Sequence, residues 1–151
     1  MSEAESNITR ELKKALDERI LILDGAMGTT IRGYGHSETD ARGARFKDAP
    51  KDLLNNGDIL SLTQPGTIGD IHKRFYEAGS DIVETNTFSG TSIAQSEFFK
   101  QDPREIGGRK DPEFYQEVIE DQFLNDLAWE INVESVKLAR KWADEIGSDT
   151  G

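Results

Sequence analysis

The sequence contains no cysteine among its 151 residues, which excludes disulfides, thiolate metal sites and cysteine nucleophiles within this chain. Long apolar runs are missing too, and none approaches the roughly 20 residues that a membrane-spanning helix requires. Basic residues are in the minority, with 18 Lys and Arg against 29 Asp and Glu and a net charge of -11. Because such a chain repels phosphate backbones and anionic lipids, we expect neither nucleic acid nor a membrane as its partner.

The N-terminal segment, residues 1–16, is charged and has no apolar core, so it does not match the pattern of a secretory signal peptide. A cytoplasmic protein is therefore expected. Ser6 or Asn7 can cap a first helix, in which Ile8 and Leu12 fall on one face at helical spacing. The length of the chain indicates a single domain.

Two short apolar runs, residues 20–23 and 81–84, have the pattern of buried parallel strands. Helices are predicted between and after these runs, at residues 64–79, around residues 93–98 and at about residues 124–146. Strands that alternate with helices indicate parallel βαβ units and an α/β fold. Only these two strands are evident, whereas a complete (β/α)8 barrel takes about 250 residues, so we expect an incomplete sheet.

Two polar segments interrupt this pattern. Residues 33–56 are rich in glycine with little periodicity, and they indicate a long loop with at most one short helical turn. Residues 101–121 are charged and contain two prolines and two glycines, so we predict a surface insertion there.

Chemistry is expected where the two predicted strands end, because ligands in α/β folds gather beyond the carboxyl ends of the strands. The residues at these ends are Asp24, Gly25 and Ala26 after the first strand, and Glu84 and Asn86 at the second. The two carboxylates can accept hydrogen bonds from an ammonium group, and the backbone N–H groups of the glycine-containing turn can surround a carboxylate. Together these groups predict a receptor for the zwitterionic end of an amino acid.

Each of these residues also has a purely structural interpretation. Asp24 can belong to an ordinary turn, Glu84 can pair with an arginine, and Asn86 can hydrogen-bond to neighbouring backbone. Their occurrence together at two successive strand ends favours a binding site. The two histidines, His36 and His72, have no second ligand at metal spacing, so we expect no metal site from them.

Residues 22–29 resemble the opening strand and loop of the homocysteine S-methyltransferase family. Three further stretches resemble the methionine synthase branch of that family, and they span residues 41–46, 55–65 and 76–88. The last of these stretches is long and its order of residues is unusual. The similarity covers roughly residues 20–98 and resumes weakly over residues 130–144.

The resemblance implies that residues 1–151 form the N-terminal part of a homocysteine-binding (β/α)8 barrel of the TIM type, with an insertion near residues 101–121. In that family homocysteine binds at the barrel mouth, its sulfur binds zinc, and its methyl group comes from methylcobalamin that methyltetrahydrofolate recharges on other domains. The contacts to homocysteine that the resemblance carries onto this chain are Asp24, Gly25, Ala26, Glu84 and Asn86.

The family's zinc ligands are cysteines, which this chain lacks, so neither a catalytic residue nor a metal ligand is assigned within it. We expect zinc and methylcobalamin to act in a full-length parent protein, where the remaining barrel strands and the cobalamin and folate domains are partners of this segment. Zinc would supply a thiolate there, since a free thiol with a pKa of about 8.5 is mostly protonated at neutral pH. The chain alone is expected to be inactive.

Two alternatives stay open at the level of the sequence. Relatives that use betaine or S-methylmethionine share the barrel and the zinc, although residues 55–58 and 84–88 favour the cobalamin branch. The chain can also be a non-catalytic remnant or an interaction module, which the missing cysteines and the incomplete barrel would explain.

Overall fold

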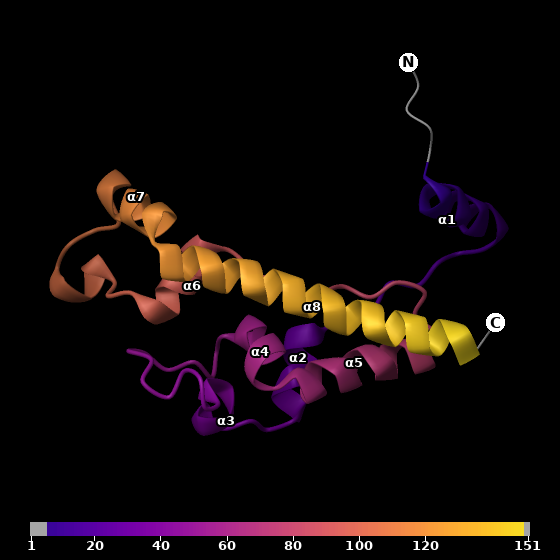
Figure 1. Ribbon diagram of the computed structural model, residues 1–151, viewed down its shortest axis with the longest axis horizontal. Coiled ribbons are helices and arrows are strands. Elements are labelled where there is room, and N and C mark those ends of the chain that lie inside the picture. The colour runs from indigo at the N-terminus through magenta and orange to yellow at the C-terminus, as the bar shows by residue number, and fades with distance from the viewer. Residues whose placement is uncertain (1–5, 150–151) are drawn as a thin grey trace, which may run out of the picture.

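The computed structural model describes residues 6–149, and it describes their side chains through residue 147. Helices form almost all of the regular structure, and Figure 1 shows the long helix α8 running across most of the others. In chain order the elements are α1 (Asn7–Glu18), α2 (Met27–Gly33), α3 (Glu38–Arg42), the 3-10 turn η1 (Gly57–Ile59), α4 (Leu60–Thr63), α5 (Pro65–Glu77), α6 (Ser92–Phe99), the 3-10 turn η2 (Pro103–Ile106), α7 (Pro112–Glu120) and α8 (Gln122–Asp149).

The predicted α/β fold, with the first βα units of an incomplete (β/α)8 barrel, is wrong for the described residues 6–149, because helices dominate there and no sheet forms. The two predicted strands do lie side by side, and Leu23 and Ile82 form an isolated parallel β-bridge. Asp24 N donates to the Ile82 carbonyl at 3.0 Å, and Asp81 N donates to the Ile22 carbonyl at 2.8 Å. The pairing is therefore real but ends after a few bonds.

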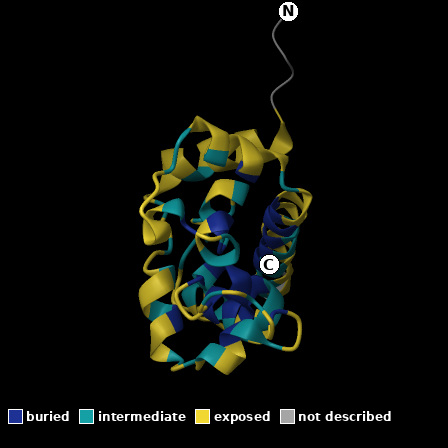
Figure 2. Ribbon diagram, turned by 90° about the vertical axis from the view of Figure 1, so that its left-hand side faces the viewer, coloured by how far each residue is buried: buried dark blue, intermediate teal, exposed yellow. Residues whose placement is uncertain are grey.

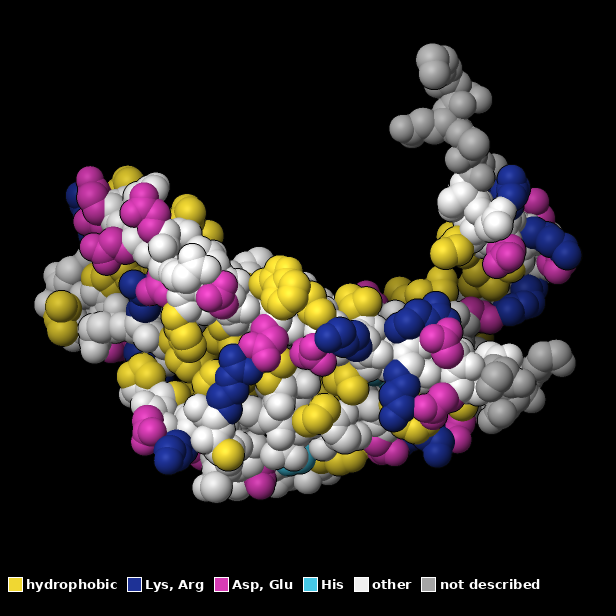
Figure 3. All heavy atoms as spheres, viewed as in Figure 1, with side chains coloured by type: hydrophobic (Ala, Val, Ile, Leu, Met, Phe, Trp, Pro, Cys, Tyr) yellow, Lys and Arg dark blue, Asp and Glu magenta, His cyan; other side chains and the backbone are white. Residues whose placement is uncertain are grey.

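The sheet fails because two paired segments leave most of their backbone groups and side chains without cover. Stable sheets in water have three or more strands or a helix packed on the apolar face, and a lone pair has two open edges. Here Ile20 is 88%, Ile22 56% and Leu23 52% exposed. Apolar side chains also lie among charged ones on the face of the molecule in Figure 3. The apolar run that suggests a buried strand is an extended, exposed segment.

The predicted helices are confirmed, since the signals that begin and end them are local. The Ser6 hydroxyl accepts from Thr9 N at 3.2 Å at the start of α1. Pro65 lies in the first turn of α5, and Gly79 follows this helix with a left-handed φ of +102°. Helix α1 buries none of its described residues and stands apart from the others in Figure 1. Residues 1–5 of the predicted N-terminal segment lie outside the described residues.

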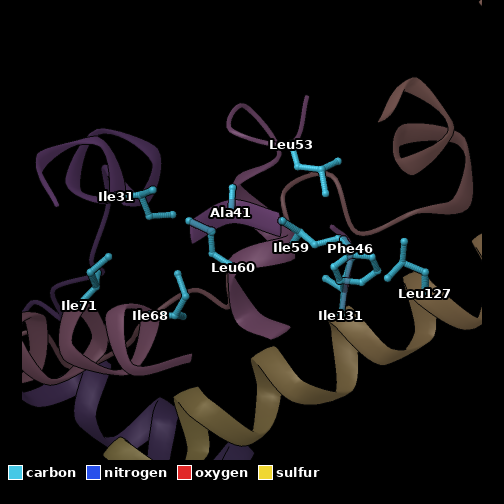
Figure 4. Close-up of a cluster of buried hydrophobic side chains, with 10 residues drawn as sticks. All are labelled: Ile31, Ala41, Phe46, Leu53, Ile59, Leu60, Ile68, Ile71, Leu127 and Ile131. Carbon is cyan, nitrogen blue, oxygen red and sulfur yellow. The ribbon is translucent and has the colours of Figure 1, made fainter. Parts of the chain in front are cut away.

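A hydrophobic core forms where α5 and α8 meet the short helices, and Figure 4 shows its side chains. Its buried members are Ile31, Ala41, Phe46, Leu53, Ile59, Leu60, Ile68, Ile71, Leu127 and Ile131. Burying each larger aliphatic side chain contributes about 1.5–3 kcal/mol before the entropy cost of folding. Gly69 on α5 lets α8 approach, because a Cβ there would lie 2.6 Å from the Trp142 indole Nε1. Figure 2 shows the buried residues in the middle of the helical body.

The predicted long loop is held in place by side chains. Helix α3 lies within residues 33–56, in agreement with the single expected turn. The Glu38 carboxylate accepts from the backbone N–H groups of Leu53 and Leu54 at 2.8–3.0 Å. The Arg42 guanidinium donates to the backbone carbonyls of residues 47, 49 and 51. These bonds fold the loop back onto α3.

Four helical parts were not predicted from the sequence, namely α2, the η1–α4 pair, η2 and α7. Both η2 and α7 lie within residues 101–121, the segment predicted as a surface insertion, and α7 contacts α6 and α8 at one end of the molecule. In the described part of the chain, no helix combines the length and the apolar character needed to cross a bilayer.

Candidate functional site

The ends of the two extended segments meet at Asp24 and Glu84. Glu84 N donates to Asp24 Oδ1 at 2.9 Å. Partial burial raises the pKa of the Asp24 carboxyl, and the bond from Glu84 N opposes that rise. The Glu84 side chain is exposed. Asp24 thus fixes the backbone of Glu84 and leaves the Glu84 carboxylate available.

A cavity of about 930 Å³ opens beside this junction, between α2, η1 and the segment that follows Glu84. Its volume is in the range of small-molecule sites. Of the five predicted homocysteine contacts, Glu84 and Asn86 line the cavity, whereas Asp24, Gly25 and Ala26 are outside its lining. The structure therefore brings part of the predicted set to one place.

The turn after the first segment lies beside the cavity. Gly25 and Ala26 are exposed, and Ala26 has a left-handed φ of 54° as the chain enters α2. The Ala26 carbonyl accepts from Thr30 N at 2.9 Å and from Thr30 Oγ1 at 3.0 Å. Met27 and Gly28, which follow the turn, do line the cavity. Two residues of the predicted N–H nest therefore border the cavity, whereas Gly25 and Ala26 do not.

Asn86 is firmly held in the cavity wall. It is 5% exposed, and its Nδ2 donates to the Gly57 carbonyl at 2.9 Å and to Ser61 Oγ at 3.2 Å. Ser135 Oγ, on α8, lies 2.7 Å from Ser61 Oγ and 3.1 Å from the Asn86 carbonyl oxygen. The structural interpretation of Asn86 therefore holds for its Nδ2. Its Oδ1 has no hydrogen-bond partner among the described residues.

Asp58 is a candidate that sequence reasoning missed. It belongs to η1, lines the cavity and is 5% exposed. Ser89 N donates to its Oδ2 at 2.5 Å. Burial raises the pKa of the carboxyl, and the bond from Ser89 N opposes this. The available signal was the stretch of residues 55–58, which carries part of the family resemblance but does not reveal that Asp58 is buried.

Arg32 on α2 brings positive charge to the cavity, and the His36 ring lines it from the loop that follows α2. Arg32 lines the cavity, is exposed, and forms no ion pair within the part of the chain that the structure describes. His36 also lines it, with Nε2 2.9 Å from Thr67 Oγ1 and its ring stacked on Tyr34. Carboxylates and a guanidinium thus share one cavity, a pattern that suits a zwitterion.

The structure offers no metal site within residues 6–149, since no group of three or more His, Asp or Glu side chains there could hold an ion. His72 lies in the interior at 0% exposure, and neither ring nitrogen has a hydrogen-bond partner. Burial lowers its pKa, so the imidazole is neutral at pH 7. His72 is a core residue of α5.

Comparison with known protein families adds one finding to this geometry. A family model described as Homocysteine S-methyltransferase matches residues 21–150. The match begins after α1 and takes in the two extended segments except for Ile20, every cavity residue discussed above and α8.

Proposed function

The chain belongs to the homocysteine S-methyltransferase family, and from that premise we propose that its cavity binds the amino-acid head of homocysteine for methyl transfer to the sulfur. The observation that carries this proposal is the cavity of about 930 Å³ whose lining includes Glu84, Asn86 and Arg32. Family membership supplies the type of reaction, and the cavity supplies the place for its acceptor.

The charges of the cavity match those of an amino-acid head. Glu84 can accept hydrogen bonds from the ammonium group, and the planar guanidinium of Arg32 can bind the carboxylate through two parallel bonds. Asp24 acts indirectly, because its bond to Glu84 N holds the backbone that carries this acid. Met27 and Phe88 in the lining offer apolar surface to the two methylene groups of the side chain.

The chain's own residues do not fit a zinc site. The sequence has no cysteine, and the described residues contain no cluster of three metal-binding side chains. Zinc would supply the thiolate form of the substrate. Our proposal gives the chain a different task, which is to bind and orient the amino-acid head, and it derives no step through zinc or methylcobalamin.

For the methyl donor we propose the cobalamin-using, methionine synthase branch of the family. The support is the stretch of residues 55–58 together with residues 84–88, the two stretches that favour this branch in the sequence. Residues of both stretches line the cavity, so the branch signal coincides with the candidate site.

Titration of the ¹⁵N-labelled 151-residue chain with L-homocysteine under reducing conditions tests the proposal. We expect NMR shifts at the Asn86 side-chain amide and at the backbone amides of Gly57 and Ser89. Glu84→Gln should raise Kd by about threefold to fivefold, the effect of an exposed charge pair worth up to ~1 kcal/mol. Glu113→Gln, on the exposed first turn of α7, is the matched control. An absence of shifts up to millimolar homocysteine would refute the proposal.

A further inference from the structure

Asp58 is a charged group of the cavity that the homocysteine contacts described so far leave unused. Its side chain is almost fully buried, at 5% exposure, and yet it lines the open cavity. Ser89 N satisfies Oδ2 at 2.5 Å. Within the described residues, Oδ1 has no hydrogen-bond partner and the carboxylate has no ion-pair partner.

A purely structural role does not account for the charge of Asp58. An asparagine in its place would accept the same bond from Ser89 N through its amide oxygen, without the cost of burying an ion. Burying a carboxylate that accepts one hydrogen bond and has no cation beside it is unfavourable, and burial accordingly raises the pKa of Asp58. The charge is therefore best explained by a partner that the protein's described residues do not contain.

The neighbourhood of Asp58 defines the kind of partner. The carbonyl oxygen of Gly57, the residue before Asp58, accepts from Asn86 Nδ2. This bond ties the Asn86 side chain to the backbone next to Asp58, and each of the two side chains keeps a free Oδ1. Both side chains line the same cavity, and both are 5% exposed. Ile31 and Leu60 contribute apolar surface to the lining. Two free acceptors in the lining of one partly apolar cavity suit a group with several N–H donors and a positive charge.

We propose that Asp58 Oδ1 and Asn86 Oδ1 form the subsite for the ammonium group of the ligand, so that Asp58 selects thiols that carry a primary amine. This inference rests on the proposed function in taking homocysteine as the natural ligand. Glu84, which is exposed, remains a weaker contact of the same ammonium group, because water screens its charge. Arg32 remains the partner of the ligand's carboxylate.

Binding of an amine at this subsite has a further consequence for Asp58. Burial now raises the pKa of its carboxyl, and a bound ammonium ion favours the ionised form. The pKa of Asp58 should therefore fall when the amine binds. A ligand without the amine would instead leave the carboxylate facing an uncharged group.

The test uses the 151-residue chain with three thiols: L-homocysteine, 3-aminopropane-1-thiol, which lacks the carboxylate, and 4-sulfanylbutanoate, which lacks the amine. Asp58→Asn removes the charge and keeps an acceptor for Ser89 N. We expect it to raise Kd at least about tenfold for the two amines, the loss typical of a hydrogen bond to a charged group. Binding of 4-sulfanylbutanoate should be unchanged or tighter. Asp48→Asn, an exposed loop residue outside the cavity, is the control.

An equal loss for all three thiols would show a structural role for Asp58, and unchanged binding of the amines would likewise overturn the inference. If 3-aminopropane-1-thiol binds through Asp58 while homocysteine does not bind, the subsite stands and the proposed function fails. If homocysteine binds equally well to the unaltered chain and to Asp58→Asn, the proposed function stands and the subsite fails. Should Asp58→Asn not fold, ¹³C NMR titration of Asp58 in the unaltered chain decides, since a pKa that does not fall with 3-aminopropane-1-thiol refutes the subsite.

Discussion

The contact between α5 and α8 and the pair of segments at residues 20–24 and 81–84 are built from similarly apolar residues, yet the first is covered and the second is open. Ile68 and Ile131 are 0% exposed, whereas Ile20 is 88% exposed. A helix satisfies its backbone internally, so one apolar face packed on another suffices to bury it. An extended segment leaves hydrogen-bonding groups at each edge and side chains on both faces, and it needs neighbours on all sides.

The largest effect should separate the two regions directly. Ile131→Ala removes a fully buried side chain of the core, and we expect it to lower the free energy of unfolding by about 2–5 kcal/mol. Ile20→Ala removes a side chain that is 88% exposed and should change it by no more than about 0.5 kcal/mol. Urea unfolding followed by circular dichroism measures both. A loss for Ile20→Ala as large as that for Ile131→Ala would mean that residues 20–23 are covered in solution.

The second largest effect should come from the close packing of α5 against α8. Gly69→Ala places a Cβ 2.6 Å from the Trp142 indole Nε1, so either α8 or the indole must move. Overpacking of this kind costs about 1–3 kcal/mol. Gly66→Ala, on the exposed first turn of the same helix, meets no atom within 4 Å and should be neutral or stabilising. Equal melting temperatures for the two variants would contradict the close approach of α5 and α8.

The same contrast explains which parts of the fold were predictable. Ser6, Pro65 and Gly79 are local signals, and the helices that they begin or end are where the sequence places them. The apolar run at residues 20–23 reports only that its side chains avoid water, and local sequence does not tell whether neighbouring strands exist to cover them. Helix α2 escaped because two glycines near its start resemble a turn.

The candidate site divides in a similar way. Glu84 and Asn86 were found because they follow an apolar run, and parallel pairing at Leu23 and Ile82 brings their segment beside Asp24. Asp58 lies in a polar stretch whose burial arises from long-range contacts with the segment that follows Glu84. Such burial is a property of tertiary structure, and residue type and spacing do not report it.

A smaller effect should come from His72, the polar side chain inside the covered region. Burial lowers its folded-state pKa below the ordinary value of 6.5, so the unfolded chain binds a proton first as the pH falls. Stability from this source is complete above pH 6.5 and is lost as the pH falls through the folded-state pKa. His72→Leu, of similar volume, should not show this loss. Urea midpoints between pH 7.5 and pH 5 measure the difference, and parallel curves for the two proteins would contradict it.

The smallest effect should be a local change in the paired segments at residues 20–24 and 81–84. Asp81 joins the two segments, because its Oδ2 accepts from Arg19 Nη1 at 2.7 Å and from Ile22 N at 2.9 Å. The bond from Arg19 is the main cause that lowers the pKa of Asp81 to about 2. The side chain of Arg19 is 57% exposed and that of Asp81 20%, so water screens the pair and Asp81→Asn should leave global unfolding unchanged at pH 7. The amide of Asp24, which is bonded to Ile82, should exchange its hydrogen faster in this variant. In the unaltered chain, the Asp24 amide should lose its protection against exchange as the pH falls from 3.8 through about 2 and Asp81 becomes protonated. Added salt should also weaken this protection, because it screens the ion pair. Identical exchange in the two proteins would mean that the pairing of the segments does not depend on this ion pair, and the contrast with the covered region would then rest on side-chain burial alone.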